Sequence, residues 1–576
     1  MGNEQSTQRA KAGGAGPDVV FSPTSPKEKH KSKGLFKRPK KSRRSNSAAP
    51  TTLSGSSDGA TIYEPQKAVV IGAGPVGSLA ALYFAKGGWQ VTVYELRGDL
   101  RNPENRSLNF TKSINLAISE RGINGLRTVD PELTESILEE AIPMHGRMIH
   151  DKKGRQSSQK YDVHKRFIRS IDRSGLNERL LDELDRMNNV ELKFNHSLKS
   201  LSLEKNEAVF ERRLGSGDYE NVRVQADLFI GADGAHSQTR RQMMKYVRLN
   251  YSQEYIDSLW CEFTIPPHPE TGDFQLDPNH LHIWPRQKFM FIALPNQDRS
   301  FTCTLFMPED MFKDIVGPEA LLGFFRKEFP DVVSLAGEEN LIGDYLKNQK
   351  LPLISLKCNP YHYRNKCVIL GDASHAMVPF YGQGMNCGFE DVRVLWEHIC
   401  NDATLTEALD NYTAERHPDC VVINDLAMNN YVEMRASVTS SSYLLKKHFQ
   451  EFLYSWFPCF GVRTLYSMIS FSNIRYSEVM KRVKRQERVL GAMGTVIMLG
   501  ATGAAGRIGF DVVIHTNTHV TFTNSAGSAE VGVVKSFSGG QYTIELKNGN
   551  HVSVPEGNVA QLKVSDPTGC PVVGGQ

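Results

Sequence analysis

The sequence lacks the features typical of disulfide-rich, zinc-binding, nucleic-acid-binding and secreted proteins. Its nine cysteines are scattered, odd in number and form no C-x-x-C pair, which argues against a disulfide framework or a zinc site of the usual spacing. We interpret them as reduced, buried thiols of a chain that faces the cytosol. The 68 Lys and Arg nearly balance the 64 Asp and Glu, which argues against a generally nucleic-acid-binding surface. No secretory signal is evident, because the first apolar run comes only near residue 68.

Residues 1–65 are short of large apolar side chains and rich in Ser, Pro and Gly. Such a segment cannot bury enough surface to fold alone, so we expect a disordered arm. It begins with MGNEQS, which fits the N-myristoylation pattern with Gly2 as the acceptor, and it contains a polybasic stretch at 27–44. An acyl chain and a polybasic patch together form a two-signal anchor for an anionic membrane. The alternative is a solvated arm whose start matches a short pattern by chance.

A dinucleotide fingerprint opens the part of the chain that we expect to fold. VVIGAGPVG places Gly72, Gly74 and Gly77 directly after an apolar strand and before a helix-like run. The first glycine permits a tight turn, the second lets the backbone approach a pyrophosphate, and the third lets helix and strand pack closely. The next strand ends in Glu95, where a carboxylate is placed to accept hydrogen bonds from the adenosine ribose. Because an acidic residue disfavours a 2′-phosphate, the site suits FAD or NAD better than NADP.

Only one such fingerprint occurs, so the chain is either an NAD dehydrogenase or a flavoprotein. A flavin needs further contacts from the protein, to its ribityl chain and to its reduced ring. DLFIGADG, 227–234, ends a strand at Asp233, which is a candidate cofactor contact or an ordinary helix cap. CVILGDASHAMVPFYGQGMN places Asp372 at the end of a buried strand, where it is positioned to bind ribityl hydroxyls. A helix beginning near Met385 would turn its positive end toward the charge-bearing edge of a reduced flavin. We interpret His375 as a packed or capping histidine with no metal set around it, and the nearby cysteine at 387 as packing.

These three stretches together resemble the aromatic-hydroxylase class of FAD-dependent monooxygenases. The residues between them are similar to one family within that class, the kynurenine 3-monooxygenases, and the similarity covers roughly residues 66–490. The motifs that carry it are SINLAISERG (113–122), IPMHGRMIHDKKGRQ (142–156), LHIWPR (281–286), SFTCTLFMP (300–308), AMVPFYGQGMNCGFEDV (376–392) and YVEMRASVTSS from Tyr431.

The resemblance implies an NADPH-dependent hydroxylation of L-kynurenine to 3-hydroxykynurenine by way of a hydroperoxide at flavin C4a. FAD would be bound, NADPH would visit as a transient co-substrate, and O₂ would supply the oxygen. We expect no catalytic side chain and no metal, because the flavin carries the chemistry. By motif, the family's substrate-binding residues fall on Arg147, Tyr161, Asn430 and Tyr466, and Phe380 is expected near the flavin ring or substrate. The expected cofactor contacts are Gly72, Gly74, Val76, Gly77, Glu95, Arg173, Asp233, Asp372, Gln383, Met385 and Asn386.

The predicted fold class is α/β. It has a Rossmann-like FAD-binding domain with an inserted β-sheet substrate domain, a helical C-terminal region, and a small extra β-rich tail. The tail is not part of the family pattern. It resembles an SH3-like barrel that binds a protein partner, with an Asn548-Gly549 turn between two strands. The expected bounds are 1–65 for the arm, 66–250 and 356–400 for the two parts of the FAD-binding domain, 251–355 for the substrate domain, 401–488 for the helical region, 489–514 for a hydrophobic candidate membrane segment, and 515–576 for the tail.

Localisation and two rival functions stay open at this point. The resemblance implies a cytosol-facing enzyme attached by its C-terminal region to the outer mitochondrial membrane. The candidate segment is Val489–Gly506, an uncharged run that just reaches spanning length, or else a soluble packing helix. Alternatives are the N-terminal anchor at another membrane, or the cytoplasm. The rival functions are a flavin hydroxylase of the ubiquinone-pathway or salicylate type, and a membrane-tethered scaffold with a silent flavin fold.

Overall fold

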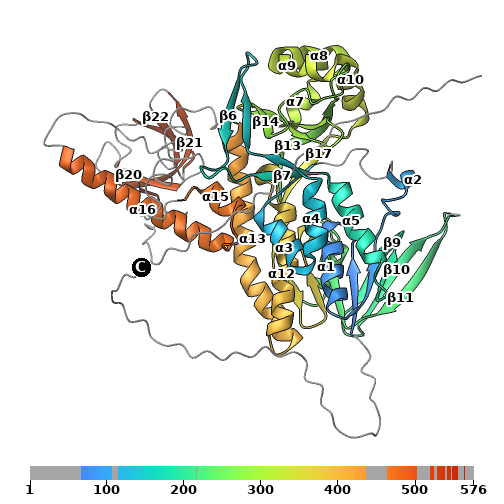
Figure 1. Cartoon of the computed structure of the whole chain (residues 1–576). Helices are drawn as coiled ribbons and strands as arrows, with labels where there is room; N and C mark the ends of the chain where they lie inside the picture. The colour runs from blue at the N-terminus through green and yellow to red at the C-terminus, as the bar shows by residue number, and fades with distance from the viewer. Residues whose placement is uncertain are drawn as a thin grey trace, which may run out of the picture. The chain divides into compact units, whose positions relative to one another are not determined.

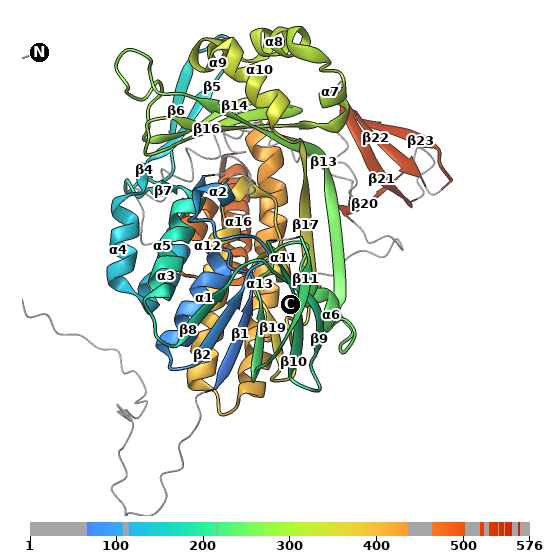
Figure 2. The ribbon, with the colours of Figure 1, turned by 90° about the vertical axis from the view of Figure 1, so that its right-hand side faces the viewer.

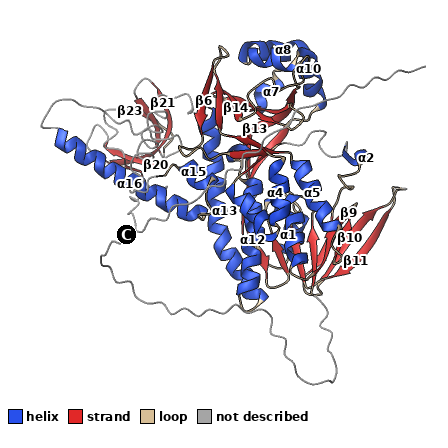
Figure 3. Cartoon of the chain, in the orientation of Figure 1, coloured by secondary structure: helices blue, strands red, loops and turns tan. Residues whose placement is uncertain are grey.

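The structure is a computed structural model that describes residues 66–106, 115–215, 217–435 and 463–501, together with five short stretches of the C-terminal tail (Figure 1). The N-terminal arm, with its myristoylation pattern and basic stretch, lies outside these residues. Figure 3 shows the mixture of helices and strands that the sequence predicts. The described stretches of the tail are 519–523, 529–538, 541–546, 548–555 and 563–564.

A six-stranded sheet carries the dinucleotide fingerprint. Its strand order is β18-β19-β12-β1-β2-β8, and each neighbouring pair is parallel except β18 with β19. The predicted strand at residue 67, the helix after it and the strand that ends before Glu95 are confirmed. β12 and β19 are apolar and wholly buried, as expected of strands covered on both faces. The strands are β1 (Lys67–Ile71), β2 (Gln90–Tyr94), β8 (Val190–Lys193), β12 (Leu228–Gly231), β18 (His362–Tyr363) and β19 (Cys367–Ile369).

Helix α1 (Pro75–Lys86) follows the Gly-rich turn directly. Gly74 is its extended N-cap, and Pro75 stands in the first turn, where a missing backbone N–H costs nothing. Most of α1 is buried, because it packs against the sheet and against α5 and α12 (Figure 2). The other helices of this part are α2 (Pro103–Arg106), α3 (Glu120–Val129), α4 (Pro131–Glu139), α5 (Arg173–Asp185), α6 (Gln238–Met243), α11 (Asp372–His375) and α12 (Gly384–Asn401), with the 3-10 turn η1 (Pro379–Tyr381).

Two small antiparallel sheets border this core. One joins β11, β10 and β9, and the ring of Phe210 from it stacks on Tyr94 of the large sheet at a centroid distance of 3.9 Å. The other, of order β3-β7-β4, brings the residues just before α3 next to those just before α5. The strands are β3 (Leu116–Ile118), β4 (Ile142–Met144), β7 (Ile168–Ile171), β9 (His196–Ser202), β10 (Glu207–Arg213) and β11 (Tyr219–Gln225).

A seven-stranded mixed sheet forms the expected β-rich insertion, in the order β17-β13-β16-β15-β14-β5-β6. It crosses the boundary that we placed at residue 250, because β5 and β6 come from the segment before that boundary and pair with β14. Helices α7 to α10, which the sequence analysis did not predict, share an aromatic-rich core with one face of the sheet. The elements are β5 (Gly146–His150), β6 (Gln156–Lys160), β13 (Asn250–Ile265), β14 (His280–Arg286), β15 (Phe289–Pro295), β16 (Phe301–Pro308), α7 (Glu309–Lys313), α8 (Gly317–Glu328), α9 (Pro330–Ala336), α10 (Glu338–Lys347) and β17 (Leu351–Asn359).

The predicted helical region contains α13 (Leu405–Arg435), α15 (Leu465–Ser470) and α16 (Tyr476–Ala501). The hydrophobic segment predicted at 489–514 coincides with the end of α16 as far as Ala501, and its remainder lies outside the described residues. Among the helices that the structure describes, none combines the length and the hydropathy needed to cross a membrane.

The tail strands form one antiparallel sheet of order β23-β22-β21-β20-β24. The predicted turn at Asn548-Gly549 is confirmed between β22 and β23, where Gly549 has a φ of +80° that favours glycine. The comparison with an SH3-like barrel stays a prediction. The strands are β20 (His519–Thr523), β21 (Ala529–Ser538), β22 (Gln541–Leu546), β23 (His551–Pro555) and β24 (Lys563–Val564).

Candidate active site

The predicted cofactor motifs, which are far apart in the sequence, converge on one cavity of about 260 Å³. The starts of α1 and α12 both reach it, so the positive ends of two helices face the same space. Five of the predicted cofactor residues line the cavity: Gly74, Val76, Arg173, Asp372 and Met385. The other lining residues come from β3, from the turn after β12 and from the loop before α12, and include Asn115, Ala117, Gly234, Met377, Pro379 and Gly382.

The glycines of the fingerprint divide between two tasks. A Cβ on Gly74 would meet no atom within 4 Å, and the same is true of Gly234 across the cavity. These two backbones therefore face open space that a ligand can approach closely. A Cβ on Gly77 would instead lie 1.9 Å from the carbonyl oxygen of Gly72, which itself has a φ of +101°. Gly72 and Gly77 thus serve the packing of the turn, and the open backbone fits a pyrophosphate.

Asp372 and Arg173 supply opposite charges to the cavity. The Asp372 side chain is exposed to the cavity, yet the surrounding protein raises its pKa by desolvation, while Arg173 opposes that shift. Desolvation lowers the pKa of Arg173, and the charge of Asp372 counters it. A carboxylate whose acceptor oxygens face the cavity suits a ligand rich in hydroxyl groups, as the ribityl chain of FAD is. The residues present therefore fit the flavin.

Two predicted cofactor carboxylates also serve the protein itself. Glu95 is buried; it accepts hydrogen bonds from the Ala73 N–H at 2.8 Å and from Arg97, which leaves acceptor capacity for a ribose. The Asp233 carboxylate accepts bonds from Ser237 Oγ and from the Thr239 N–H and Oγ1, so it stabilises the start of α6. The N-cap of α6 is Ser237, so Asp233 supports the cap but is not the cap itself, and the backbone of its neighbours Ala232 and Gly234 lines the cavity.

Gln383 and Asn386 lie at the start of α12 with their side chains turned into the protein. The Asn386 amide accepts from the Ser119 N–H at 2.8 Å and donates to the carbonyls of Ala117 and Gly382, also at 2.8 Å. It therefore fixes the glycine loop to the β3–α3 junction. Gln383 is 2% exposed and bonds Ser119 and Tyr476. The helix begins at Gly384, one residue before the predicted start.

The predicted substrate residues form a second group. Arg147 on β5 is 7% exposed, and its guanidinium carbon lies 5.9 Å from the ring centroid of Tyr161 and 5.3 Å from that of Tyr466. The two tyrosine rings stack at 4.9 Å. Burial raises the pKa of both phenols, which therefore stay protonated donors at neutral pH. The Tyr161 hydroxyl is buried without a well-aligned hydrogen-bond partner among the described residues, so a cation and a phenolic donor are placed to receive a carboxylate.

Asn430 reaches the same region from α13, but its amide donates to the Phe380 carbonyl at 2.7 Å. It thereby holds the loop before α12, and Phe380 stacks on Tyr431 at 4.4 Å. Glu433, one helical turn after Asn430, lies 3.4 Å from Arg147 and partly neutralises it. The sequence analysis missed Glu433. Its only signal was the three-residue spacing from Asn430, which places both on one face of a helix.

Comparisons with known proteins agree with this geometry. The family model described as "FAD binding domain" matches residues 66–425. The kynurenine 3-monooxygenase of Aspergillus terreus is 52% identical over 448 residues, which cover 74% of this chain and 89% of that protein. The enzyme of the same name from Chaetomium globosum is 50% identical over 457 residues, which cover 74% of this chain and 95% of that protein. The chain belongs to the kynurenine 3-monooxygenase family.

Solved structures of distant oxygenases share the fold of this member of the kynurenine 3-monooxygenase family. The tetrameric form of 2-methyl-3-hydroxypyridine-5-carboxylic acid oxygenase matches with a TM-score of 0.52 at 16% identity, covering 66% of this chain and 95% of that one. The p-nitrophenol 4-monooxygenase of Pseudomonas putida matches with a TM-score of 0.52 at 16% identity, covering 67% of this chain and 93% of that one. At this identity the likeness concerns the fold alone.

A buried cluster in this family member corrects one expectation. His375, Cys387, Asp391 and Cys420 bring potential metal-ligating atoms within 4.8 Å of one another, so the expectation that no such set surrounds His375 is wrong. The guanidinium of Arg416 already occupies the cluster, with Nε 2.8 Å from Asp391 and Nη2 3.3 Å from the Cys387 sulfur. Because a cation is built in and burial raises the pKa of both thiols, we assign the cluster a structural role.

The free energy of unfolding of this protein should fall at alkaline pH, because His375 loses its proton there. Burial lowers the pKa of His375, but the Asp391 carboxylate outweighs burial, and the pKa is raised from 6.5 to about 9. A raised pKa contributes stability that is complete below pH 6.5 and is lost as the pH rises through 9. The shift corresponds to about 3 kcal/mol. Thermal midpoints measured from pH 6 to 9.5 should therefore fall more steeply in the unaltered chain than in His375→Gln. If the thermal midpoints of the two proteins changed with pH in the same way, a stabilising charge on His375 would be contradicted.

Proposed function

We propose that the chain is an FAD-dependent monooxygenase that hydroxylates L-kynurenine to 3-hydroxykynurenine with NADPH and O₂. The observation that carries this proposal is the buried Arg147 beside the stacked rings of Tyr161 and Tyr466. The relatives that match over most of their length carry the name kynurenine 3-monooxygenase. A family's activity is supported when the site residues implied by its motifs come together in space, as these do.

The cofactor site would be built by the cavity-lining residues. The open backbone at Gly74 and Gly234 and the start of α1 suit a pyrophosphate, and Asp372 with Arg173 suits the ribityl chain. The start of α12 offers its free N–H groups to negative charge on a reduced flavin ring. Bound FAD supplies the redox chemistry, which is acceptance of a hydride from NADPH and transfer of one oxygen atom from O₂.

The protein's own part in the reaction is to orient the substrate and keep the site dry. Arg147 binds the substrate carboxylate, and the protonated phenols of Tyr161 and Tyr466 donate to it. The aniline ring then lies along an apolar wall. That wall excludes water, which would otherwise divert reducing equivalents into hydrogen peroxide. The wall contains Met144, Ile168 and Leu294, with Leu281 and Ile292 packed against them.

Purified protein should bind FAD and oxidise NADPH at least about tenfold faster when L-kynurenine is present, because bound substrate completes the closed site. The measurement is NADPH absorbance decay with and without substrate, with the product identified by mass spectrometry. Salicylate and a phenolic ubiquinone precursor are the matched controls. Stimulation by a control alone would favour the other hydroxylase type, and absence of a flavin spectrum would favour the silent scaffold.

Localisation at the outer mitochondrial membrane, facing the cytosol, is part of the same proposal. Its support in the structure is the exposed basic stretch 481–488 on α16, directly before the uncharged end of that helix. Basic side chains beside an uncharged segment suit the headgroups of anionic lipids. The N-terminal anchor and the cytoplasm are the alternatives. For residues 515–576 we propose a protein partner, because a small β-sheet module outside the family pattern suits an interaction domain.

A further inference from the structure

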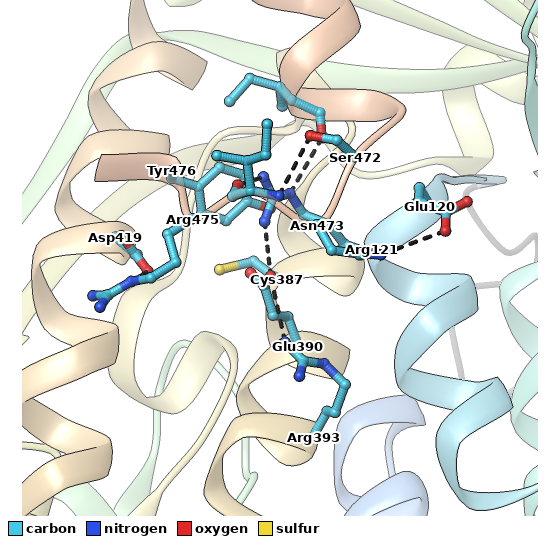
Figure 4. Close-up of polar contacts among 12 residues, drawn as sticks. Glu120, Arg121, Cys387, Glu390, Arg393, Asp419, Ser472, Asn473, Arg475 and Tyr476 are labelled. Carbon is cyan, nitrogen blue, oxygen red and sulfur yellow. Dashed lines mark hydrogen bonds and ion pairs between the residues drawn. The ribbon is translucent and has the colours of Figure 1, made fainter. Parts of the chain in front are cut away.

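The turn between α15 and α16 is held by a network that the proposed mechanism does not use (Figure 4). This turn, residues 471–475, follows the short helix that carries Tyr466. Arg121, the second residue of α3, reaches across it: Nε donates to the Ile469 carbonyl at 3.2 Å, and Nη2 donates to the Ile474 carbonyl. One guanidinium therefore binds both the end of α15 and the turn that follows it. The first of these bonds joins residues 348 positions apart in the sequence.

The charge of Arg121 is compensated inside the protein. Its Nη1 donates to Glu390 Oε1 at 2.7 Å, and the other oxygen of Glu390 accepts from Arg416 at 2.8 Å. All three side chains are at most 3% exposed. Because every member of this chain of charges is paired, the guanidinium is fixed in position and so are the two carbonyls it holds.

Tyr476, the first residue of α16, connects this network to the start of α12. Its ring lies over the Arg121 guanidinium at 3.8 Å, and its hydroxyl donates to Gln383 Oε1 at 2.9 Å. Burial raises the pKa of Tyr476 well above its usual value, so the hydroxyl stays a donor. The Gln383 Nε2 then points at Ser119 Oγ, 3.4 Å away. The Gln383 amide is therefore held between the hydroxyl groups of Tyr476 and Ser119.

Helices α3 and α13 hold the same turn from two further points. Asp419 on α13 accepts from Arg475 Nε and from the Ser477 N–H, each at 2.9 Å. Asn473 donates to Glu120 on α3 at 3.4 Å. Figure 4 shows these side chains around the turn. The turn is therefore bound at several points by α3 and α13, and Arg121 connects it through Glu390 to α12, whose first residues line the cofactor cavity.

We propose that Tyr476 and Arg121 are positioning residues for the hydroxylation. Arg121 fixes the turn that places Tyr466 beside Arg147, and Tyr476 holds the Gln383 side chain in place at the start of α12. The inference rests on the proposed function. A displaced Tyr466 or a freely rotating Gln383 would loosen the closed site and admit water. The consequence is uncoupling, in which NADPH is consumed and hydrogen peroxide is released in place of 3-hydroxykynurenine.

Tyr476→Phe tests the inference, because it removes the hydroxyl and keeps the ring on Arg121. We expect near-normal FAD content and thermal midpoint, while hydrogen peroxide formed per NADPH consumed rises about two- to tenfold, the range typical of one lost hydrogen bond. The matched control is Tyr246→Phe, whose hydroxyl donates to a backbone carbonyl at 3.2 Å far from the turn and whose coupling should not change. A purely structural role would lower the midpoint of Tyr476→Phe and leave the peroxide ratio unchanged.

A second pair of variants tests the route through Gln383. In a Gln383→Ala background, Tyr476→Phe should add no further uncoupling, because its target is gone. Additive effects of the two substitutions would overturn the proposed route, and normal coupling in Tyr476→Phe would overturn the inference as a whole. Both outcomes are distinct from failure of the proposed function, in which the unaltered chain itself shows no NADPH oxidation stimulated by kynurenine.

Discussion

Arg147→Ala should lower kcat/KM for L-kynurenine about 10²–10³-fold, because losing the charged partner of a buried carboxylate costs ~3–4 kcal/mol. Arg147 is 7% exposed, and the phenols beside it carry no charge at neutral pH, so they cannot replace its positive charge. FAD content and the flavin spectrum should stay unchanged, since Arg147 does not line the cofactor cavity. The measurement is steady-state NADPH oxidation over a range of kynurenine concentrations.

Two comparisons sharpen this test of Arg147. Arg147→Lys keeps the charge but loses the planar fork, so an intermediate loss is expected. Arg127→Ala removes an exposed arginine whose partner, Glu135, is also exposed, and its activity should match that of the unaltered chain. If Arg147→Ala left the Michaelis constant for kynurenine unchanged, the substrate assignment would be wrong.

Gly77→Ala should abolish FAD binding by disrupting the turn itself. Its Cβ would lie 1.9 Å from the Gly72 carbonyl oxygen, which is backbone and has no room to move. Gly74→Ala should behave differently, because a Cβ there meets no protein atom within 4 Å and instead enters the cofactor cavity. We expect Gly74→Ala to fold and to bind FAD about 10²-fold more weakly, since the backbone no longer approaches the pyrophosphate closely.

Gly323→Ala is the control for both glycine variants. Gly323 lies inside α8, and a Cβ there meets nothing within 4 Å. Alanine should stabilise that helix by about 0.5–1 kcal/mol and leave FAD affinity unchanged. Circular dichroism and fluorescence titration of the apoprotein with FAD separate folding from cofactor binding. Equal FAD affinity in Gly74→Ala and Gly323→Ala would remove Gly74 from the cofactor site.

The residues predicted to bind the cofactor fall into two groups: some face the cavity, and others stabilise the protein around it. Gly74, Arg173 and Asp372 face the cavity, whereas the side chains of Asp233 and Asn386 are engaged with backbone groups of the chain itself. Burying an amide or a carboxylate without hydrogen-bond partners costs free energy of folding, so the protein supplies partners for these two groups from its own backbone. Residues of one motif therefore divide between binding and support, and a motif by itself does not show which residue does which.

The sequence by itself determined the local parts of this protein. The strand, the Gly-rich turn and the helix around Gly72, Gly74 and Gly77 follow from neighbouring residues alone, because turn geometry and apolar periodicity act over short distances. The hairpin strands of the insertion and the turn at Asn548-Gly549 follow for the same reason. The family motifs also indicated Arg147, Tyr161, Asn430 and Tyr466 before any contact between them was known.

Only the tertiary structure decided which distant residues meet. β5 and β6 join a sheet whose other strands begin about a hundred residues later, and no local pattern records that pairing. The helical spacing of Glu433 from Asn430 did not show that Glu433 meets Arg147. No pattern in the sequence indicated that Tyr476 meets Arg121 and Gln383. The physical reason is that burial and hydrogen bonding depend on the neighbours a side chain acquires on folding. A buried charge such as Arg121 is tolerated only because Glu390 and two backbone carbonyls, from elsewhere in the chain, surround it.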